Sequence, residues 1–491
     1  MNRVVQKTYD IVVIGGGPGG IPAAVAAARR GHKVLLVERN SFLGGAATSG
    51  LGILGYLDRQ GKKALGGIAQ ELMDRLEEMH GAMGHFRCPV HNSISPISPE
   101  CFKIVAVEMC REAGAEILFN NELLDVTVDN GKIKTVTVYG KCVRTVLRAK
   151  VFIDATGDGD LAYLAGAPYV SGQDDTGIMQ PATLMFTVTN YDLEKLLFYA
   201  EQHPEDFGIK EDYAQGYNPD FFRATPGHCF IGLTEMIRRA KAAGDFDVPR
   251  NQFIYITTPT ESELAINTSR ITNIDASDVY QLSDGLTMGY EQVHELLRFM
   301  NKYIPGFEHA QLSMIAPSLG VRETRHFKGC FRLTRDNMYS EEVRQQAVAQ
   351  SAYNIDVHSG VKDHIDLTPI DRPFGIPYGC MVPVQTDGLL LSGRTICLDT
   401  ATYASARVMG PCIAVGEAVG EAAALCIEQQ IEPRAEDLVV LQERLRKNGN
   451  LFCAERVIFA SNERSSYLCS RKFELQLHKV RNYQYQGSTQ E

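Results

Sequence analysis

The sequence predicts an α/β fold that begins with a Rossmann-like parallel sheet, and three local patterns predict it. A strand of the buried type at residues 9–14 runs directly into a glycine-rich turn and an alanine-rich helix. A second apolar strand, residues 33–37, ends in Glu38. Residues 123–128 and 133–139 alternate around an Asp-Asn-Gly turn, which predicts a β-hairpin beside the parallel sheet.

The glycine-rich turn matches a dinucleotide-binding fingerprint. Gly15, Gly17 and Gly20 fit G-x-G-x-x-G between a strand and a helix, and Pro18 and Gly19 complete the turn. The first glycine allows the tight turn, the second lets backbone N–H groups approach a pyrophosphate, and the third lets the helix lie close to the strand. The pyrophosphate would then lie at the positive end of the helix dipole. A glycine-rich turn without a ligand is the disfavoured alternative.

Glu38 follows the second strand at the spacing expected of a ribose-binding acid. Its carboxylate can accept hydrogen bonds from both ribose hydroxyls and would repel a 2′-phosphate, so NADP is disfavoured. After Arg39 comes a loop rich in small residues, with Gly44, Gly45 and Ala46 among them. Such a loop lets a large planar cofactor pass against the backbone.

Composition narrows the function classes. A chain of 491 residues is too long for one core, so we expect two or three structural units. The formal net charge of −10 argues against a nucleic-acid partner. The sequence shows neither a signal-peptide pattern nor a run of about 20 apolar residues, so no membrane partner is expected.

The twelve cysteines include no C-x-x-C pair, and no metal-ligand spacing is present. We therefore expect no metal, disulfide scaffold or iron–sulfur cluster. Buried thiols of this kind suit a reducing, cytoplasmic location.

Helix and strand signals continue along the chain. Ser98-Pro99-Glu100 predicts the capped start of a helix that runs to about residue 113. The remaining predictions are helices at residues 66–80, 412–427 and 438–447 and strands at 117–119 and 148–153.

The strand predicted at 148–153 enters Asp154-Ala155-Thr156-Gly157-Asp158-Gly159-Asp160. An apolar strand entering Ala-Thr-Gly after such a fingerprint resembles the two-dinucleotide-fold flavoproteins of the glutathione-reductase type. The longer form more closely resembles the FAD-dependent oxidoreductase family that includes the flavin domain of the heterodisulfide reductase flavoprotein. Further stretches similar to that family lie at residues 267–275, 320–325, 353–358, 388–394 and 405–412.

The resemblance implies a discontinuous FAD domain with an inserted α+β substrate domain. Residues 1–165 would form the first part of the FAD domain, 166–365 the inserted substrate domain, 366–432 the return segment, and 433–491 a C-terminal helix and tail. Together with the motifs, it implies that FAD is bound by Gly15, Gly17, Pro18, Gly19, Gly20, Glu38, Arg39, Gly44, Gly45, Ala46, Ala155, Thr156, Gly157, Asp160, Gly393, Arg394, Arg407, Val408 and Met409.

The return segment carries the expected flavin chemistry. The N–H groups at residues 407–411, before the helix predicted at 412–427, would face the pyrimidine edge of the flavin, and the helix dipole would stabilise negative charge there on reduction. Two departures stand out: Gly393-Arg394 replaces the Gly-Asp of many glutathione-reductase-type proteins, and the cluster cysteines of the heterodisulfide reductase flavoprotein are missing. A second G-x-G-x-x-G is also missing, although a second nucleotide site without the motif stays open.

Candidate catalytic residues lie in the inserted domain. Arg322 and Arg325 would share a helix face or tight loop and bind a carboxylate or carbonyl oxygen, or else pair with Glu323 or another acid. His358, and with less support His326, would move a proton near neutral pH.

Four more residues are weaker candidates. Arg270 could bind substrate or flavin, or brace the domains, while Tyr403 would lie near the cofactor. Tyr378 and Cys380 would line the site, or Cys380 would be a buried thiol.

The resemblance and the motifs imply an FAD-dependent oxidoreductase that transfers a hydride between a small organic substrate and flavin N5. One alternative is a flavin monooxygenase that uses NAD(P)H and oxygen. Another is a flavin-bearing electron-transfer subunit or RNA-modification partner. The electron donor or acceptor stays open, and base rates suggest a homodimer.

Overall fold

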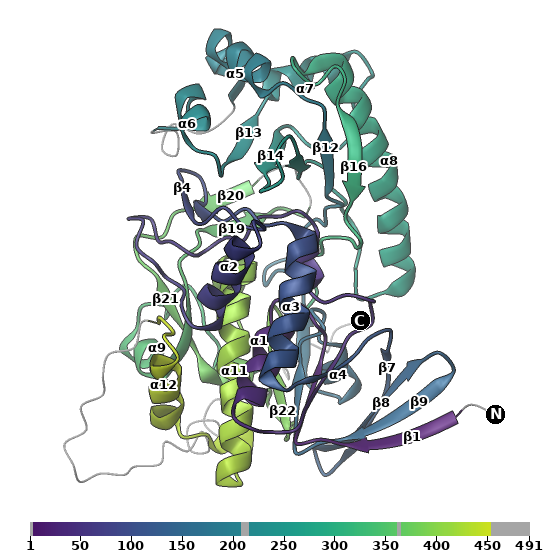
Figure 1. Ribbon diagram of the computed structural model, residues 1–491, viewed down its shortest axis with the longest axis vertical. Helices are drawn as coiled ribbons and strands as arrows, with labels where there is room; N and C mark the ends of the chain where they lie inside the picture. Colours follow the sequence, from purple (N-terminus) through teal and green to yellow (C-terminus); the bar gives the residue numbers. More distant parts are fainter. Residues whose placement is uncertain (1–2, 208–215, 361–364, 453–491) are drawn as a thin grey trace, which may run out of the picture.

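The structure, a computed structural model, describes residues 3–207, 216–360 and 365–452. It has two hydrophobic cores, one around a parallel sheet and one around an antiparallel sheet (Figure 1). The fold is thus the predicted mixed α/β class, with a Rossmann-like sheet and a second, α+β unit.

A five-stranded sheet forms the centre of the first core, and every pairing in it is parallel. Four of its strands are buried on both faces, as expected where helices cover both sides. The last strand among the described residues enters next to β10, so a segment about 235 residues later completes the sheet. In spatial order the strands are β22 (Leu389–Leu391), β10 (Val151–Asp154), β2 (Ile11–Ile14), β3 (Val34–Val37) and β6 (Glu116–Leu118).

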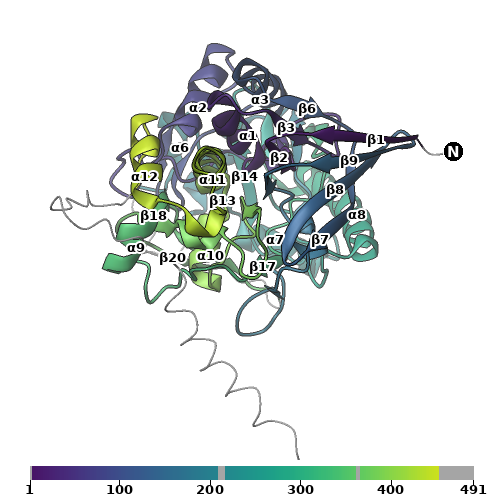
Figure 2. The ribbon, with the colours of Figure 1, turned by 90° about the horizontal axis from the view of Figure 1, so that it is seen from below.

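The first helix, α1 (Gly20–Arg29), packs against the long helix α11 (Met409–Gln429), and the two lie side by side in Figure 2. A Cβ at Gly416 would lie 2.3 Å from the carbonyl oxygen of Gly19, and one at Gly420 would lie 2.3 Å from that of Ala23. The glycines therefore let the two backbones touch. Helix α11 is long and apolar enough to cross a membrane, but 94% of its most apolar stretch is buried in the protein, as in a core helix.

The predicted hairpin is confirmed as β7 (Glu122–Asp129) and β8 (Lys132–Gly140). The strand predicted at residues 148–153 is confirmed as β10, but with a later start. Arg148 is the last residue of β9 (Val143–Arg148), and β10 begins three residues later in another sheet. Ala149 and Lys150 carry the chain across, and the N–H of Lys150 donates to the carbonyl of Asp10. The strand β1 (Arg3–Thr8) was not predicted and pairs in parallel with β9.

The predicted helices are confirmed, with one shifted start. Helix α3 (Pro99–Ala113) begins after Ser98, whose hydroxyl accepts from the N–H of Cys101. Helix α2 (Ile68–Glu78) and α12 (Leu438–Lys447) lie where predicted. Helix α11 begins three residues before the predicted Cys412, because Pro411 needs no N–H partner in the first turn.

The second core surrounds an antiparallel sheet, drawn in the upper half of Figure 1. The 25-residue helix α8 (Val279–Tyr303) covers it together with shorter helices. In spatial order the strands are β13 (Cys229–Gly232), β14 (Phe253–Thr257), β15 (Leu264–Ile266), β12 (Phe186–Thr189) and β16 (Gln311–Ile315).

Short elements join the two cores. Gly50 lies against this second sheet, since a Cβ on it would be 3.3 Å from that of Ala265. The remaining elements are β4 (Phe86–Cys88), β5 (Asn92–Ile94), β11 (Tyr169–Ser171), β17 (Arg325–Phe327), β18 (Ala347–Ser351), β19 (Ile355–His358), β20 (Ile365–Thr368), β21 (Phe374–Pro377), α4 (Asp160–Leu164), α5 (Leu193–Gln202), α6 (Pro219–Ala224), α7 (Thr234–Ala242), α9 (Glu341–Gln346) and α10 (Thr400–Ala406), with 3-10 turns at η1 (Gly45–Thr48), η2 (Pro204–Phe207), η4 (Tyr378–Met381) and η5 (Pro433–Ala435).

Candidate active site

The glycine turn after β2 is packed so closely that side chains do not fit. Gly15 has a φ of +102°, and a Cβ on it would lie 2.3 Å from the carbonyl oxygen of Ala155. A Cβ on Gly20 would lie 1.8 Å from the carbonyl oxygen of Gly15. The turn therefore contacts the Ala-Thr-Gly segment after β10, as the two predicted cofactor segments require.

Glu38 holds the turn to the next loop. Its buried carboxylate accepts from the N–H of Gly16 at 2.7 Å and from the N–H and side-chain amide of Asn40, both at 2.8 Å. Each carboxylate oxygen keeps further lone pairs for a ribose hydroxyl. The sequence did not indicate that Gly16 and Asn40 orient this acid.

A second glycine loop lies against the first. The N–H of Gly44 donates to the carbonyl of Gly16 at 2.8 Å. Gly45, at a φ of +48°, lies next to Gly17, whose Cα is 3.1 Å from the position of a Cβ on Gly45. Two backbones without side chains thus face each other, where the predicted cofactor would pass.

Asp154 organises the Ala-Thr-Gly segment from inside the core. Its fully buried carboxylate accepts from the N–H and hydroxyl of Thr156 at 3.0 and 2.8 Å and from the N–H of Ala162 at 2.8 Å. Burial raises the pKa of Asp154 to about 6 against these hydrogen bonds. Thr156 is therefore turned toward its own loop, and the backbone of Gly157 faces the guanidinium of Arg394.

The return segment closes onto the glycine turn. The hydroxyl of Ser392 donates to the carbonyl of Gly19 at 2.9 Å. Arg394 donates to Asp158 at 2.7 Å, so the arginine that replaces the expected acid forms an ion pair with the Ala-Thr-Gly loop. At the start of α11, Val408 provides no side-chain cap, which leaves the first N–H groups of the helix available to an acceptor.

These contacts bring together four of the predicted cofactor segments: the glycine turn, the loop at residues 44–46, the Ala-Thr-Gly segment and Gly393-Arg394. Burial raises the pKa of Asp160, and the charge of Arg39, which lies within electrostatic reach, partly offsets this rise. Burial likewise raises the pKa of the Cys412 thiol in the first turn of α11, and the charges of Arg394 and Arg407 partly offset that rise. The glycines that exclude side chains and the uncapped helix start fit a dinucleotide with a flavin. The individual FAD contacts stay predictions.

Arg322 and Arg325 do not share a helix face or a tight loop. Residues 321–324 have no regular structure, and Arg325 begins β17. Arg325 forms an ion pair with Asp160 at 3.0 Å, donates to the carbonyl of Asp158 at 3.0 Å and stacks over the ring of Tyr163. Arg325 thus forms the ion pair that the sequence left open as the alternative, with an acid other than Glu323.

Arg322 lies instead beside Arg407. Its Nη1 atom donates to the carbonyl of Pro181 at 2.5 Å and to the hydroxyl of Thr183 at 2.8 Å. Arg407 donates to the side-chain carbonyl of Gln180 at 3.3 Å and to the carbonyl of Asp356 at 3.1 Å. Residues 180–183 therefore hold both guanidiniums.

Two further buried arginines belong to the same cluster. Thr183 also donates to the carbonyl of Ser269, next to Arg270, and Arg270 donates to the carbonyl of Ser359. Burial lowers the pKa of Arg322 to about 9, and the charges of Arg407, Arg250 and Arg270 add to this effect, whereas Asp356 opposes it. We call Arg250, Arg270, Arg322 and Arg407 the arginine cluster.

His358 lies at the edge of the arginine cluster. Asp356 and His358 are two residues apart on β19 and therefore share one face of that strand. The Nε2 atom of His358 lies 3.2 Å from Oδ2 of Asp356. The hydroxyl of Tyr353 donates to the same oxygen at 3.0 Å, and Arg407 lies 3.5 Å from it. The Nδ1 atom of His358 is buried and has no hydrogen-bond partner among the described residues.

The charges around this pair favour a carboxylate beside a neutral imidazole. Burial lowers the pKa of His358 to about 3; Asp356 opposes the change, and Arg322 and Arg407 add to it. Burial alone would raise the pKa of Asp356, but His358 and Arg407 hold it well below its usual range. Nε2 therefore carries the proton that Asp356 accepts, and Nδ1 carries a lone pair.

The other candidates have structural partners. His326 bonds to the buried carboxylate of Glu323 at 2.9 Å and packs against the ring of Tyr403. The hydroxyl of Tyr403 donates to the carbonyl of Arg322, and that of Tyr378 to the carbonyl of Pro433. Cys380 is a buried thiol with a raised pKa. Of these residues, Tyr403 thus has a direct contact with the arginine cluster.

Sequence reasoning missed Gln180, Arg250 and the role of Asp356. Asp356 stood within the motif at residues 353–358, so its position two residues before His358 on a strand was a usable signal. Gln180 and Arg250 carried no local signal. Their positions depend on segments far apart in the chain. Among the described residues, no group of three or more His, Cys, Asp or Glu side chains could hold a metal ion.

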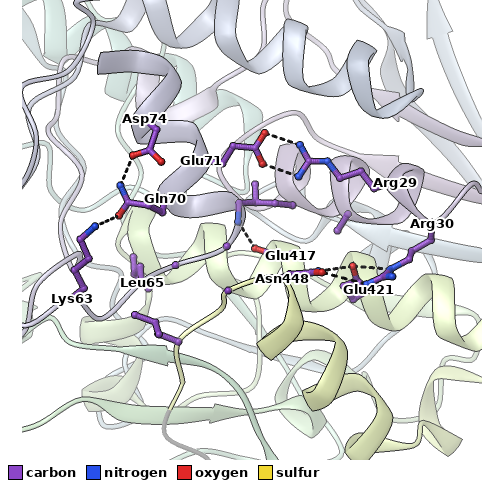
Figure 3. A pocket seen from close by; sticks show the side chains of 16 residues that line it. Arg29, Arg30, Lys63, Leu65, Gln70, Glu71, Asp74, Glu417, Glu421 and Asn448 are labelled. Atoms are coloured by element: carbon purple, nitrogen blue, oxygen red, sulfur yellow. Dashed lines mark hydrogen bonds and ion pairs between the residues drawn. The ribbon is translucent and has the colours of Figure 1, made fainter. Parts of the chain in front are cut away.

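A polar cavity of about 630 Å³ lies elsewhere, between α1, α2 and α11 (Figure 3). Glu71 pairs there with Arg29, and Glu421 with Arg30. Glu417 accepts from the N–H of Ile68 at 2.7 Å, and burial raises its pKa to about 7. This cavity includes no member of the arginine cluster and no residue predicted to bind the cofactor.

Parts of the chain are similar in sequence to curated proteins. Over 159 residues the chain is 34% identical to thiamine thiazole synthase of Aeropyrum pernix, covering 30% of this chain and 54% of that protein. Over 291 residues it is 28% identical to the aklavinone 12-hydroxylase DnrF of Streptomyces peucetius, covering 48% and 55%. The chain thus spans about half the length of these curated relatives.

Among solved structures, p-nitrophenol 4-monooxygenase from Pseudomonas putida aligns with 90% of this chain and 84% of its own, at a TM-score of 0.45 and 12% identity. A geranylgeranyl bacteriochlorophyll reductase-like protein from Thermoplasma acidophilum aligns with 90% and 83%, at 0.41 and 16%. The family described as FAD dependent oxidoreductase matches residues 10–445. The chain therefore belongs to the FAD dependent oxidoreductase family, and FAD is its cofactor.

Proposed function

We propose that this enzyme oxidises a small organic substrate by passing a hydride to FAD, with His358 accepting the accompanying proton. The observation that carries the proposal is the buried Nδ1 atom of His358, which lacks a partner among the described residues while Nε2 is held by Asp356. A histidine whose second nitrogen is fixed by a carboxylate is the usual arrangement of a general base.

FAD, when bound, supplies the two-electron acceptor at N5. The chain's own residues would move the proton and orient the substrate. Asp356 keeps the proton of His358 on Nε2, so that the lone pair of Nδ1 is available for a substrate hydroxyl proton. Arg407 bonds to Gln180 and Asp356 and lies two residues before the start of α11, which connects the base to the end of the predicted flavin site.

Arg322 and Arg325 receive different roles. Arg322 joins the cluster beside His358 and would orient the substrate. Arg325 pairs with Asp160 next to the Ala-Thr-Gly loop and is a positioning residue for the cofactor segment. This division replaces the symmetric roles that the sequence suggested.

A flavin monooxygenase is the second candidate, because the chain resembles a named hydroxylase over 291 residues. It predicts rapid NADPH consumption coupled to oxygen uptake. The narrower resemblances to the glutathione-reductase type and to the heterodisulfide reductase flavoprotein stay predictions. So do the cytoplasmic location and the homodimer, which cell fractionation and light scattering would test.

The proposal is tested by anaerobic mixing of the FAD-loaded enzyme with a panel of alcohols and hydroxy acids, followed by flavin absorbance. At least one compound should bleach the flavin, and His358→Gln should slow bleaching by about 10²–10⁴-fold at unchanged FAD content. His203→Gln, at an exposed histidine that follows α5, is the matched control. Equal bleaching rates in the wild type and His358→Gln would exclude His358 as the base.

A further inference from the structure

The arginine cluster gathers positive charge from four separate segments. Arg322 and Arg407 contact neighbouring residues of the 180–183 segment, and Thr183 links Arg322 to the carbonyl of Ser269 beside Arg270. Arg270 in turn donates to the carbonyl next to His358, and Arg250 is almost fully buried within electrostatic reach of Arg322. Arg322 and Arg407 thus lie within electrostatic reach of the proposed base, and Arg270 contacts the residue that follows it.

Several polar atoms of this region are not used by the protein. Arg322 bonds through Nη1, and no hydrogen bond among the described residues uses its Nε or Nη2 atoms, which lie on one edge of the guanidinium plane. The Nε atom of Arg407 and the Nε2 atom of Gln180 are buried without a partner among those residues. All of these atoms are donors, so the matching ligand group is an acceptor.

Arg322 and Arg407 act on the same carboxylate, since Asp356 lies 3.5 Å from Arg407 and is the one acid among the main charges that act on Arg322. Glu323 is turned away, because its two oxygens accept from the N–H of Gln180 and bond to His326. Burying the two guanidiniums of Arg322 and Arg407 near one carboxylate is costly unless an anion compensates them.

We propose that the substrate of the reaction proposed above is an organic hydroxy carboxylate, whose carboxylate is bound by Arg322 and Arg407 beside Nδ1 of His358. A planar carboxylate can accept from the Nε and Nη2 atoms of one guanidinium as a bidentate pair. The site thus selects a carboxylate over a neutral alcohol. This assignment rests on the proposed function.

The chemical step balances without another reactant. The carbinol carbon loses its C–H hydrogen with two electrons to FAD, the hydroxyl loses its proton to Nδ1 of His358, and the carbon–oxygen single bond becomes a carbonyl. The carboxylate stays ionised throughout. A single turnover therefore needs only FAD as oxidant.

Binding of unreactive anions tests the assignment on the FAD-loaded enzyme. Oxalate, malonate and succinate are titrated while flavin absorbance and melting temperature are followed, with succinamide as a neutral probe and inorganic phosphate as a second anion. At least one carboxylate should bind saturably, and Arg322→Gln and Arg407→Gln should each weaken it by about tenfold or more. Arg238→Gln, at an exposed arginine of α7, should leave the affinity unchanged.

Arg322→Lys keeps the positive charge but cannot donate two parallel hydrogen bonds, so it should also weaken carboxylate binding. It replaces Arg322→Gln as the test variant if Arg322→Gln loses FAD or does not fold. The assignment is overturned if no carboxylate binds, if succinamide or phosphate binds as tightly as the best carboxylate, or if the Arg407→Gln enzyme binds it like the wild type.

The hydride proposal fails separately. If a neutral alcohol bleaches the flavin at the same rate in the wild type and in Arg322→Gln, hydride transfer is supported and the carboxylate assignment is rejected. If carboxylate binding depends on Arg322 but no compound of the panel bleaches the flavin, the carboxylate site is supported and hydride transfer is rejected.

Discussion

The Nε2 atom of His358 lies 3.2 Å from Oδ2 of Asp356, and Tyr353 donates its hydroxyl to that same oxygen. This pair lies on a four-residue strand, β19, in which alternate side chains share a face. It fixes one nitrogen of the imidazole, while the other has no hydrogen-bond partner among the described residues.

Asp356→Asn should disable the base without removing it. The amide no longer favours the tautomer that carries its proton on Nε2, so anaerobic flavin reduction should slow by about 10²-fold or more while FAD content stays unchanged. Tyr353→Phe, which removes one donor but keeps the carboxylate, should slow it by less than about tenfold. A wild-type rate in Asp356→Asn would show that the pair is purely structural.

The pH profile should reflect the depressed pKa of His358. Its pKa is lowered to about 3, so the neutral base is present throughout pH 5–8 and is lost only as the pH falls toward 3. Arg322→Gln removes one of the positive charges that lower this pKa, so the acid limb of the rate profile should move to higher pH. Stopped-flow flavin reduction with pH jumps between pH 3 and 8 measures both enzymes. An unchanged limb in the variant would contradict this coupling.

Alanine substitutions of Gly17 and Gly20 should have different effects, the first on FAD binding and the second on stability. A Cβ on Gly17 has its nearest neighbour at 3.9 Å, so Gly17→Ala should fold like the wild type yet retain less FAD, because the methyl group takes the space of the pyrophosphate. Gly20→Ala would place its Cβ 1.8 Å from a carbonyl oxygen and should lower the stability of the apoprotein itself. Melting temperatures with and without FAD separate the two outcomes. Full FAD retention by Gly17→Ala would contradict the predicted contact between Gly17 and the pyrophosphate.

Glu417 should make stability fall as the pH rises. Burial raises its pKa to about 7, above its usual 4.5, so the folded state favours the protonated form and loses stability between about pH 4.5 and 7. Glu417→Gln should therefore stabilise the protein at pH 8, on the order of 2 kcal/mol, and have little effect at pH 4.5. Urea unfolding at both pH values measures the difference. Glu428→Gln, at a half-exposed glutamate on the same helix, is the control. A variant less stable than the wild type at pH 8 would contradict the prediction.

Local patterns were sufficient for the elements that carry their own signals. Ser98 caps α3 as its sequence indicates, and the Asp-Asn-Gly turn joins β7 to β8. The strand break at Ala149 and Lys150 was missed, because the local sequence does not show that the chain leaves one sheet for another. The start of α11 moved for a local reason, the tolerance of the first turn for proline.

The sequence by itself determined the dinucleotide turn and the α/β class, because glycine spacing and strand–helix alternation are local properties. The FAD family was implied by the resemblance of longer motifs to known flavoproteins. Only the tertiary structure decided which arginine does what. Arg322 and Arg325 are three residues apart, yet one joins Arg407 near Gln180 and the other pairs with Asp160. Their partners come from segments far away in the chain, so contacts in the folded protein, rather than spacing, distinguish the guanidinium that we propose binds substrate from the one in an ion pair.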